Sequence, residues 1–216
     1  MITIYSAIYP SFAHLPELDG VEDWKVIFKP EHMISSEAIL VLHGGSDISP
    51  SYYHEKSNKY VYADVPSPRD EVESDLIDAA VERGIPIFGI CRGAQFLCIK
   101  NGGKLVQHVT NHQSDHRLMT NTGDCLKTNS AHHQMMFPFG TEHEMLAWSN
   151  RPISERYLGE KEQELNVPLE PEIVYYPKLK GLGIQGHPEW LSSKTRFVQY
   201  CLKLAEEKLV KNVIRG

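Results

Sequence analysis

A cysteine lies between a short apolar segment and a helical pattern, in the sequence IPIFGICRGAQF at 85–96. Gly89 and Gly93 stand two residues before and two residues after Cys91. This spacing is typical of a nucleophile elbow, in which a strained strand-to-helix turn exposes a reactive side chain above a sheet. The helix dipole would favour the Cys91 thiolate, and the backbone N–H of Arg92 could donate to an oxyanion. The alternative is a buried structural thiol beside a tight turn.

A candidate general base lies in GIQGHPEW at 183–190. Pro188 favours an extended backbone at His187, the residue before it. In an extended segment residues i and i+2 project to the same side, so Glu189 can reach the imidazole of His187. A cysteine nucleophile needs a base that a third group orients, which makes Cys91, His187 and Glu189 a candidate triad. Taken alone, the H-P-E motif is more commonly explained by a histidine in a turn without a chemical role.

A glycine pair ends the apolar run in LHGGSDISPSYY at 42–53. Glycine lets a backbone N–H approach an acyl oxygen with no Cβ in the way. Gly45 could therefore join Arg92 as a second oxyanion donor. The alternative is an ordinary loop at the end of a strand.

The segments that must position these residues alternate between apolar runs and helical patterns. The runs AILVL at 38–42 and IPIFGI at 85–90 are apolar at nearly every position, as in parallel strands that helices cover on both faces. Ser67 is a good N-cap for the helix that follows it, and Gly84 ends that helix. Further strands are expected over 2–8 and 24–28, and helices over 68–83, 92–100 and 192–212. The pattern predicts an α/β fold.

A polar insertion at 151–171, rich in charge and proline, interrupts shorter β-like pieces between 104 and 187. The segments on either side of it do not look able to fold alone, so a surface loop is expected rather than a linker. The 216 residues are therefore predicted to form a single domain, 1–216.

The charge balance excludes several partners. The chain has 22 basic and 28 acidic side chains, a net charge of −6, and no basic cluster. Binding to nucleic acid or to an anionic membrane surface is therefore not expected. The first twenty residues lack the basic start and apolar run of a signal peptide, and no run approaches the roughly 18 apolar residues of a membrane span. Four dispersed cysteines favour a reducing, cytoplasmic location over a disulfide framework.

Three motifs, GICRGAQ, the strand-end glycine pair and GIQGHPE, resemble the class I glutamine amidotransferase superfamily with its Cys-His-Glu triad. The resemblance covers about 38–110 and 125–190. GGSDISPSYY with PRDEVES, and NSAHHQ at 129–134, are similar to the branch that includes γ-glutamyl-γ-aminobutyrate hydrolase and other γ-glutamyl hydrolases. The resemblance implies a flavodoxin-like three-layer sandwich with a central, mostly parallel sheet. It also implies hydrolysis of a γ-glutamyl amide through a γ-glutamyl thioester.

The resemblance also assigns roles to residues. It makes Cys91 the nucleophile, His187 the base and Glu189 its orienting group, with the N–H groups of Gly45 and Arg92 as oxyanion donors. The substrate-binding residues that it implies are Gly44, Gln95, Ser130, His132 and His133.

Two residues depart from the family pattern. Gly186 stands where the family usually has a large aromatic residue, and we expect it to widen the site. His43 stands where the family has a proline, and it is either a polar group behind the site or a surface residue. The carboxylates of Asp70 and Glu73 suit a helix start. Their similarity to the family's R-D-x-x-E pattern modestly favours a role near the pocket.

Five of the eleven histidines lie between His108 and His133. The spacing of His108, His112 and His116 would align metal ligands on a helix, but the surrounding segment does not look helical. Cysteines at ligand spacing are absent nearby. We therefore predict no metal and no cofactor, with His132 and His133 in the substrate pocket and the others in loops.

The expected function is a cysteine-dependent amidohydrolase that releases glutamate from a γ-glutamyl-amine or from glutamine. One alternative is a glutaminase subunit that supplies ammonia to a separate synthetase partner. Another is a non-catalytic binding module that retains the fold. The partner is a small molecule in the first case, and the sequence leaves a homodimer open.

Overall fold

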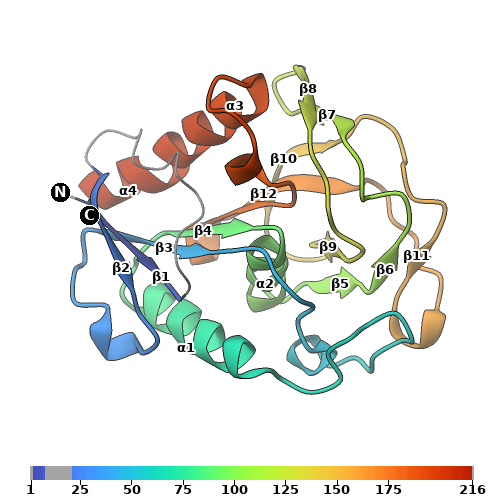
Figure 1. Cartoon of the computed structure of the whole chain (residues 1–216), viewed down its shortest axis with the longest axis horizontal. Coiled ribbons are helices and arrows are strands. Elements are labelled where there is room, and N and C mark those ends of the chain that lie inside the picture. Colours follow the sequence, from blue (N-terminus) through green and yellow to red (C-terminus); the bar gives the residue numbers. More distant parts are fainter. Residues whose placement is uncertain (1, 8–20, 216) are drawn as a thin grey trace.

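A nine-stranded sheet forms the centre of the computed structural model, which describes residues 2–7 and 21–215 (Figure 1). The segment 8–20, on which much of the prediction against a signal peptide depends, lies outside the described residues. The strands of this sheet are β1 (Ile2–Ser6), β2 (Val21–Val26), β3 (Ala38–Leu42), β4 (Ile87–Ile90), β7 (His116–Thr120), β8 (Cys125–Thr128), β10 (Glu144–Ser149), β12 (Pro171–Tyr176) and β13 (Gly181–Ile184). Their order is β2-β1-β3-β4-β13-β12-β10-β7-β8.

The strands β2, β1, β3, β4 and β13 are parallel, and the remaining four extend the sheet in antiparallel fashion. Parallel neighbours end at the same edge of a sheet, so the residues that follow β3, β4 and β13 meet there. Gly44 follows β3, Cys91 follows β4 directly, and His187 follows β13. The sheet order therefore assembles the predicted site from three distant parts of the chain.

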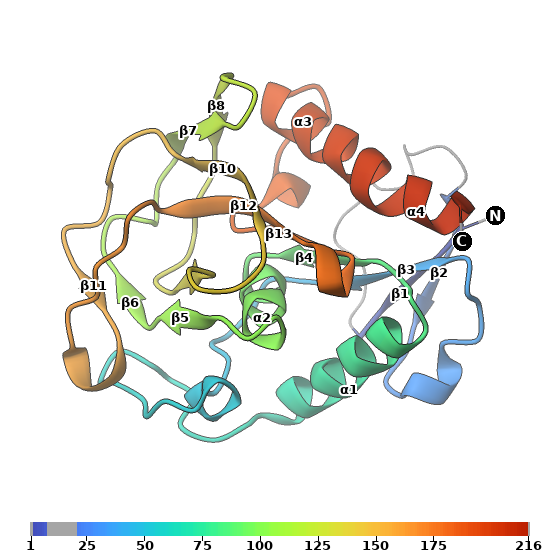
Figure 2. The ribbon, with the colours of Figure 1, turned by 180° about the vertical axis from the view of Figure 1, so that it is seen from behind.

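Helices cover both faces of the parallel strands (Figures 1 and 2). They are α1 (Pro68–Glu82), α2 (Arg92–Lys100), α3 (Arg196–Ala205) and α4 (Lys211–Arg215), with a π-helical turn at Glu206–Val210 joining the last two. In β3, Ile39 and Val41 pack in the core that contains α3, whereas Leu40 and Leu42 pack in the core of α1 and α2. This alternation explains why β3 is apolar throughout. The predicted three-layer α/β sandwich is confirmed.

The N-caps of α1 and α3 fix where these two helices begin. Ser67 caps α1 in a capping box, since its Oγ accepts from the Asp70 N–H and its N–H donates to the Asp70 carboxylate. The C-terminal helix begins at Arg196 and not at 192, because Thr195 supplies the N-cap. The expected start at 192 is therefore wrong by one helical turn.

The predicted insertion at 151–171 is a surface segment that contacts two parts of the chain distant from it in sequence, β6 and the segment around Asn58. It contains β11 (Tyr157–Leu158), which pairs with β6 (His108–Val109). The Asn58 side chain donates to the carbonyl of Gly159 in the same segment, at 3.1 Å.

β5 (Lys104–Val106) pairs with β9 (Met135–Phe137) in a second small sheet. Single 3₁₀ turns cover Pro30–His32, Pro50–Tyr53, Glu160–Glu162, Pro177–Leu179 and Pro188–Trp190.

Within the described ranges, no helix combines the length and the apolar character that crossing a bilayer requires.

Candidate active site

Cys91 occupies a strained turn between β4 and α2. Its backbone has φ = 50° and ψ = −105°, and it is the N-cap of α2. A non-glycine residue in such a conformation costs about 1–3 kcal/mol, so the surrounding structure must hold it there. The Cys91 N–H donates to the Ile184 carbonyl at 2.7 Å, and the Cys91 carbonyl accepts from the Gln95 N–H at 3.0 Å. The strained turn that the sequence predicts is therefore present.

The two glycines that flank Cys91 are required by close backbone contacts. A Cβ at Gly89 would lie 2.6 Å from the backbone of Gly93, and a Cβ at Gly93 would lie 2.3 Å from the Leu42 carbonyl oxygen. Both distances are far below van der Waals contact. The spacing of the glycines therefore serves the packing of α2 against β3 and β4.

His187 is held from three directions. Its Nδ1 lies 2.7 Å from Glu189 Oε1, as the i, i+2 spacing predicts. Its ring stacks on Trp190 with the centroids 3.7 Å apart. The Asn129 side chain accepts from the His187 N–H at 2.9 Å and donates to its carbonyl at 2.7 Å. The sequence predicts neither contact: the Asn129 contact depends on tertiary packing, whereas Trp190 reaches the ring through the local turn Pro188–Trp190.

The environment of His187 favours its protonated form. Burial alone would lower its pKa, but the hydrogen bonds and charges of Cys91 and Glu189 outweigh this effect and raise the pKa to about 9. His187 is therefore an imidazolium at neutral pH, and a positive charge beside a thiol favours the nucleophilic thiolate. The Gln185 amide also lies 3.9 Å from the Cys91 sulfur.

Gly44, in the loop after β3, lies against both the base and the nucleophile. A Cβ at Gly44 would lie 2.8 Å from His187 Cε1 and 3.6 Å from Cys91 Cβ. The first glycine of the pair is therefore required by contact with the imidazole. At Gly45, a Cβ would lie 2.1 Å from Arg69 Nη1.

Arg69 holds the glycine loop in place. Its guanidinium donates to the carbonyls of Gly44 and His43 at 3.0 and 2.9 Å, and to Glu73 Oε1 at 2.8 Å. Arg69 was not predicted as a site residue, although it stands in the PRDEVES motif. Its long side chain reaches back from α1 to the end of β3.

The Arg92 guanidinium is completely buried and forms ion pairs with Asp70 and Glu73. Glu73 therefore contacts both Arg69 and Arg92. Two carboxylates and two guanidiniums balance one another in this buried network. The network joins α1 to the elbow and to the glycine loop, which supports the predicted role of Asp70 and Glu73 near the pocket beyond a helix-dipole effect.

The predicted substrate residues form two groups. The Gln95 side chain donates to the Gln134 carbonyl at 2.9 Å, and His132 Nδ1 lies 2.8 Å from the same carbonyl. His133 is half-buried and pairs with Asp47 of the glycine loop at 2.9 Å. Burial and the nearby His112 hold the pKa of His132 well below its usual range.

Ser130 lies deeper than the predicted pocket requires. Its hydroxyl donates to the His112 carbonyl at 2.7 Å, and it is buried. The His132 N–H donates to the same carbonyl at 3.0 Å. These bonds connect Ser130 and His132 to the loop at 112, and the roles of Gln95, Ser130, His132 and His133 in substrate binding stay predictions.

The two departures from the family pattern have structural explanations. A Cβ at Gly186 would lie 2.6 Å from Thr128 Oγ1 and 3.0 Å from the Asn129 carbonyl oxygen. The expectation that Gly186 widens the site is wrong, because β8 already fills this space. His43 is buried, and burial lowers its pKa, so it is the polar group behind the site and not a surface residue.

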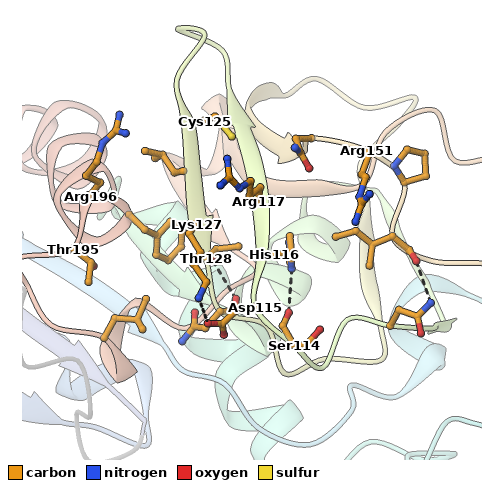
Figure 3. Close-up of a pocket in the computed structure, with 18 residues that line it drawn as sticks. Ser114, Asp115, His116, Arg117, Cys125, Lys127, Thr128, Arg151, Thr195 and Arg196 are labelled. Carbon is orange, nitrogen blue, oxygen red and sulfur yellow. Dashed lines mark hydrogen bonds and ion pairs between the residues drawn. The ribbon is translucent and has the colours of Figure 1, made fainter.

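A cavity of about 1400 Å³ lies beside the triad rather than on it, and Figure 3 shows the residues that line it. Asn129, which bonds the His187 backbone, contributes to its wall together with Thr128, Leu191 and Phe197. Cys91 and His187 do not line it. Its basic side chains come from β7, β8, a loop and the start of α3: Arg117, Lys127, Arg151 and Arg196.

The comparison with protein families agrees with this geometry. The peptidase C26 model matches residues 29–168, more than half of the chain. The chain belongs to the peptidase C26 family. The matched range of this C26 chain contains the glycine loop and the cysteine elbow, and it ends before the H-P-E motif at 187–189.

Individual relatives of the C26 chain are distant. The glutamine amidotransferase-like protein YvdE of Lactococcus lactis is 29% identical over 157 residues, which cover 63% of this chain and 66% of the relative. The γ-glutamyl-γ-aminobutyrate hydrolase of Escherichia coli O157:H7 is 28% identical over 167 residues, or 69% and 62% of the two chains. The matched regions span about two thirds or less of these relatives. The suspected γ-glutamyl hydrolase branch is nevertheless supported.

The fold is shared with solved structures. A crystal structure described as that of a GMP synthase subunit from Thermoplasma acidophilum superposes with a TM-score of 0.61, at 17% identity, over 100% of this chain and 95% of that one. At this identity the likeness concerns the fold alone. It confirms the predicted flavodoxin-like sandwich.

Proposed function

We propose that this C26 chain hydrolyses the γ-glutamyl amide bond of a γ-glutamyl-amine or of glutamine and releases glutamate. The observation that carries the proposal is that Cys91 and the Glu189-paired His187 meet after adjacent parallel strands. Both lie against Gly44, where a Cβ would be 2.8 Å from His187 Cε1 and 3.6 Å from Cys91 Cβ. The similarity of this chain to γ-glutamyl-γ-aminobutyrate hydrolase supports a γ-glutamyl amide as the substrate.

In the proposed reaction the Cys91 thiolate attacks the side-chain amide carbonyl carbon. The N–H groups of Gly45 and Arg92 hold the oxyanion, and His187 donates its proton to the leaving amine. Collapse of the tetrahedral species leaves a γ-glutamyl thioester on Cys91. His187 then takes a proton from water, whose oxygen attacks the thioester, and glutamate leaves as the thiolate is restored.

The first experiment measures glutamate release by the protein alone from a panel that contains glutamine and N-substituted γ-glutamyl amides. Wild-type protein should release glutamate, Cys91→Ala should not, and Cys125→Ala should match wild type because Cys125 lies in β8, outside the triad. If the wild type releases no glutamate from any substrate, or if Cys91→Ala is as active, the proposal fails.

A glutaminase subunit is the second candidate. It is favoured by the fold shared with a protein described as a GMP synthase subunit. In the same panel, a strong preference for substituted amides supports the self-contained hydrolase, whereas a preference for glutamine supports the ammonia-supplying glutaminase. A thiol-directed glutamine analogue tests the non-catalytic module, which predicts no adduct on Cys91.

A further inference from the structure

A second polar cluster lies behind the triad, and the proposed reaction does not use it. It consists of His112, His116 and Glu172, whose ligand atoms all lie within 4.8 Å of one another. His112 lies in the loop before β7, His116 begins β7, and Glu172 lies in β12. The segment that carries the two histidines is not helical, as the sequence predicts. A loop and two strands nevertheless bring the three side chains together.

Several atoms of this cluster are buried without a hydrogen-bond partner. The His112 side chain is 0% exposed, and neither of its ring nitrogens has a hydrogen-bond partner among the described residues. Its Nε2 lies 3.3 Å from Glu170 Oε1, out of line for a hydrogen bond. Glu172 Oε2 also lacks a partner. Each such buried group costs about 1–3 kcal/mol, which points to an additional ligand at this position.

His116 has the contacts of a metal-binding histidine. Its Nδ1 lies 3.3 Å from the Ser114 carbonyl, so Nδ1–H can donate to the backbone and leave Nε2 with a free lone pair. Nε2 lies 2.7 Å from Glu172 Oε1, which also accepts from Ser149 Oγ at 3.1 Å. This pair is held either by a proton on Nε2 or, after a small separation of the two groups, by a cation that both bind. Metal-bound histidines usually donate their other N–H to a carbonyl in this way.

The charges of the cluster also call for a cation. Glu170 and Glu172 are both buried, and in the described part of the chain their ion pairs are with His112 and His116. No lysine or arginine is paired with either carboxylate there. Glu170 is compensated by hydrogen bonds from the N–H groups of Ile153 and Ser154 and from the Tyr157 hydroxyl. The charge of Glu172 requires compensation by a proton on a histidine or by a metal ion.

We propose that His112, His116 and Glu172 bind a divalent transition metal of the zinc class. Two imidazoles and one carboxylate are a ligand set that Zn²⁺ accepts, with a fourth position open. Zinc bonds of this type place the ligand atoms roughly 3.3 Å apart, so binding would draw the more distant ligand atoms together and separate His116 Nε2 from Glu172 Oε1. His116 lines the cavity of Figure 3, from which water or another ligand can occupy the fourth position.

The site would stabilise the segment that supports the base. The carbonyl of His112 accepts from Ser130 and His132, and the neighbouring Asn129 bonds the backbone of His187. A metal ion on His112 therefore ties β7 and β12 to this segment.

The test titrates the protein with Co²⁺ and follows the visible d–d absorption of a tetrahedral site, with Zn²⁺ as competitor. Cys91 is first alkylated with iodoacetamide, because a cysteine and a histidine in contact can also bind these ions. We expect one Co²⁺ per chain. His116→Ala and Glu172→Gln should each weaken binding at least about tenfold. His143→Ala, which alters a histidine of another loop, should bind as wild type.

Far-UV circular dichroism establishes that each variant is folded. Two ligand variants are used so that the test still stands if one of them does not fold. The proposal is overturned if alkylated wild-type protein binds no stoichiometric Co²⁺, or if both variants bind it as wild type does. This result is independent of whether the protein hydrolyses a γ-glutamyl amide.

Discussion

Arg92 and Glu73 form a buried ion pair between the residue after the nucleophile and the second turn of α1. Glu73 accepts from Arg69 as well, and Arg69 holds the carbonyls of His43 and Gly44. One carboxylate thus connects the two backbone segments that carry the proposed oxyanion donors, Gly45 and Arg92. Glu73 is a positioning residue in this arrangement.

Replacing Glu73 by glutamine should lower both activity and stability. The change leaves the buried Arg92 guanidinium with Asp70 alone and should lower the free energy of unfolding by about 3–5 kcal/mol. A shift of the oxyanion donors should lower kcat roughly 10- to 100-fold with a smaller effect on KM. Urea unfolding and steady-state kinetics measure the two effects. Glu71→Gln, on the exposed face of the same helix, is the matched control, and equal behaviour of the two variants would contradict the positioning role.

Gly44→Ala should displace the base. The new Cβ would lie 2.8 Å from His187 Cε1, so the imidazole must move away from Cys91. Misplacement of a catalytic group by about 1 Å costs on the order of 100-fold in rate. Kinetics with a γ-glutamyl amide measure the loss. Gly159→Ala is the control, because its Cβ would meet only the flexible Leu165 side chain, away from the site. An unchanged kcat in Gly44→Ala would show that His187 is not held by this contact.

The rate should fall at alkaline pH. Cys91 and Glu189 raise the pKa of His187 to about 9, against the lowering effect of burial, so the imidazolium persists below pH 9 and is lost above it. Its loss removes both the partner of the thiolate and the proton donor for the leaving amine. We therefore expect kcat/KM to decline above about pH 9.

Glu189→Gln tests the assignment of that decline. It removes a charge that raises the pKa of His187, so the alkaline decline should move to lower pH. The pH profiles of the two proteins, recorded with one substrate, measure the shift. An alkaline limb at the same pH in both would mean that another group controls it.

Gly186→Ala should destabilise the fold without widening the site. The added Cβ would meet Thr128 Oγ1 at 2.6 Å, and overpacking of this kind costs about 1–3 kcal/mol. Thermal or urea unfolding measures the loss. The double variant with Thr128→Ala should recover part of it, because the nearest clashing atom is gone. If Gly186→Ala is as stable as wild type, β8 can move away from the added Cβ without cost.

The elbow and the base were predictable because their geometry is local. The spacing around Cys91 determines a tight turn between a strand and a helix, and the i, i+2 relation of His187 and Glu189 needs only an extended backbone. Runs that are apolar at nearly every position require cover on both faces, which predicts the three layers.

The tertiary structure decided the features that join distant segments. The roles of Arg69 and Asn129, the tight space at Gly186, and the meeting of His112 and His116 with Glu172 all depend on which elements pack against one another. A residue's type and its near neighbours determine its backbone preference. Its long-range contacts follow from the packing of whole elements, because burial and charge pairing act between segments that are far apart in the sequence.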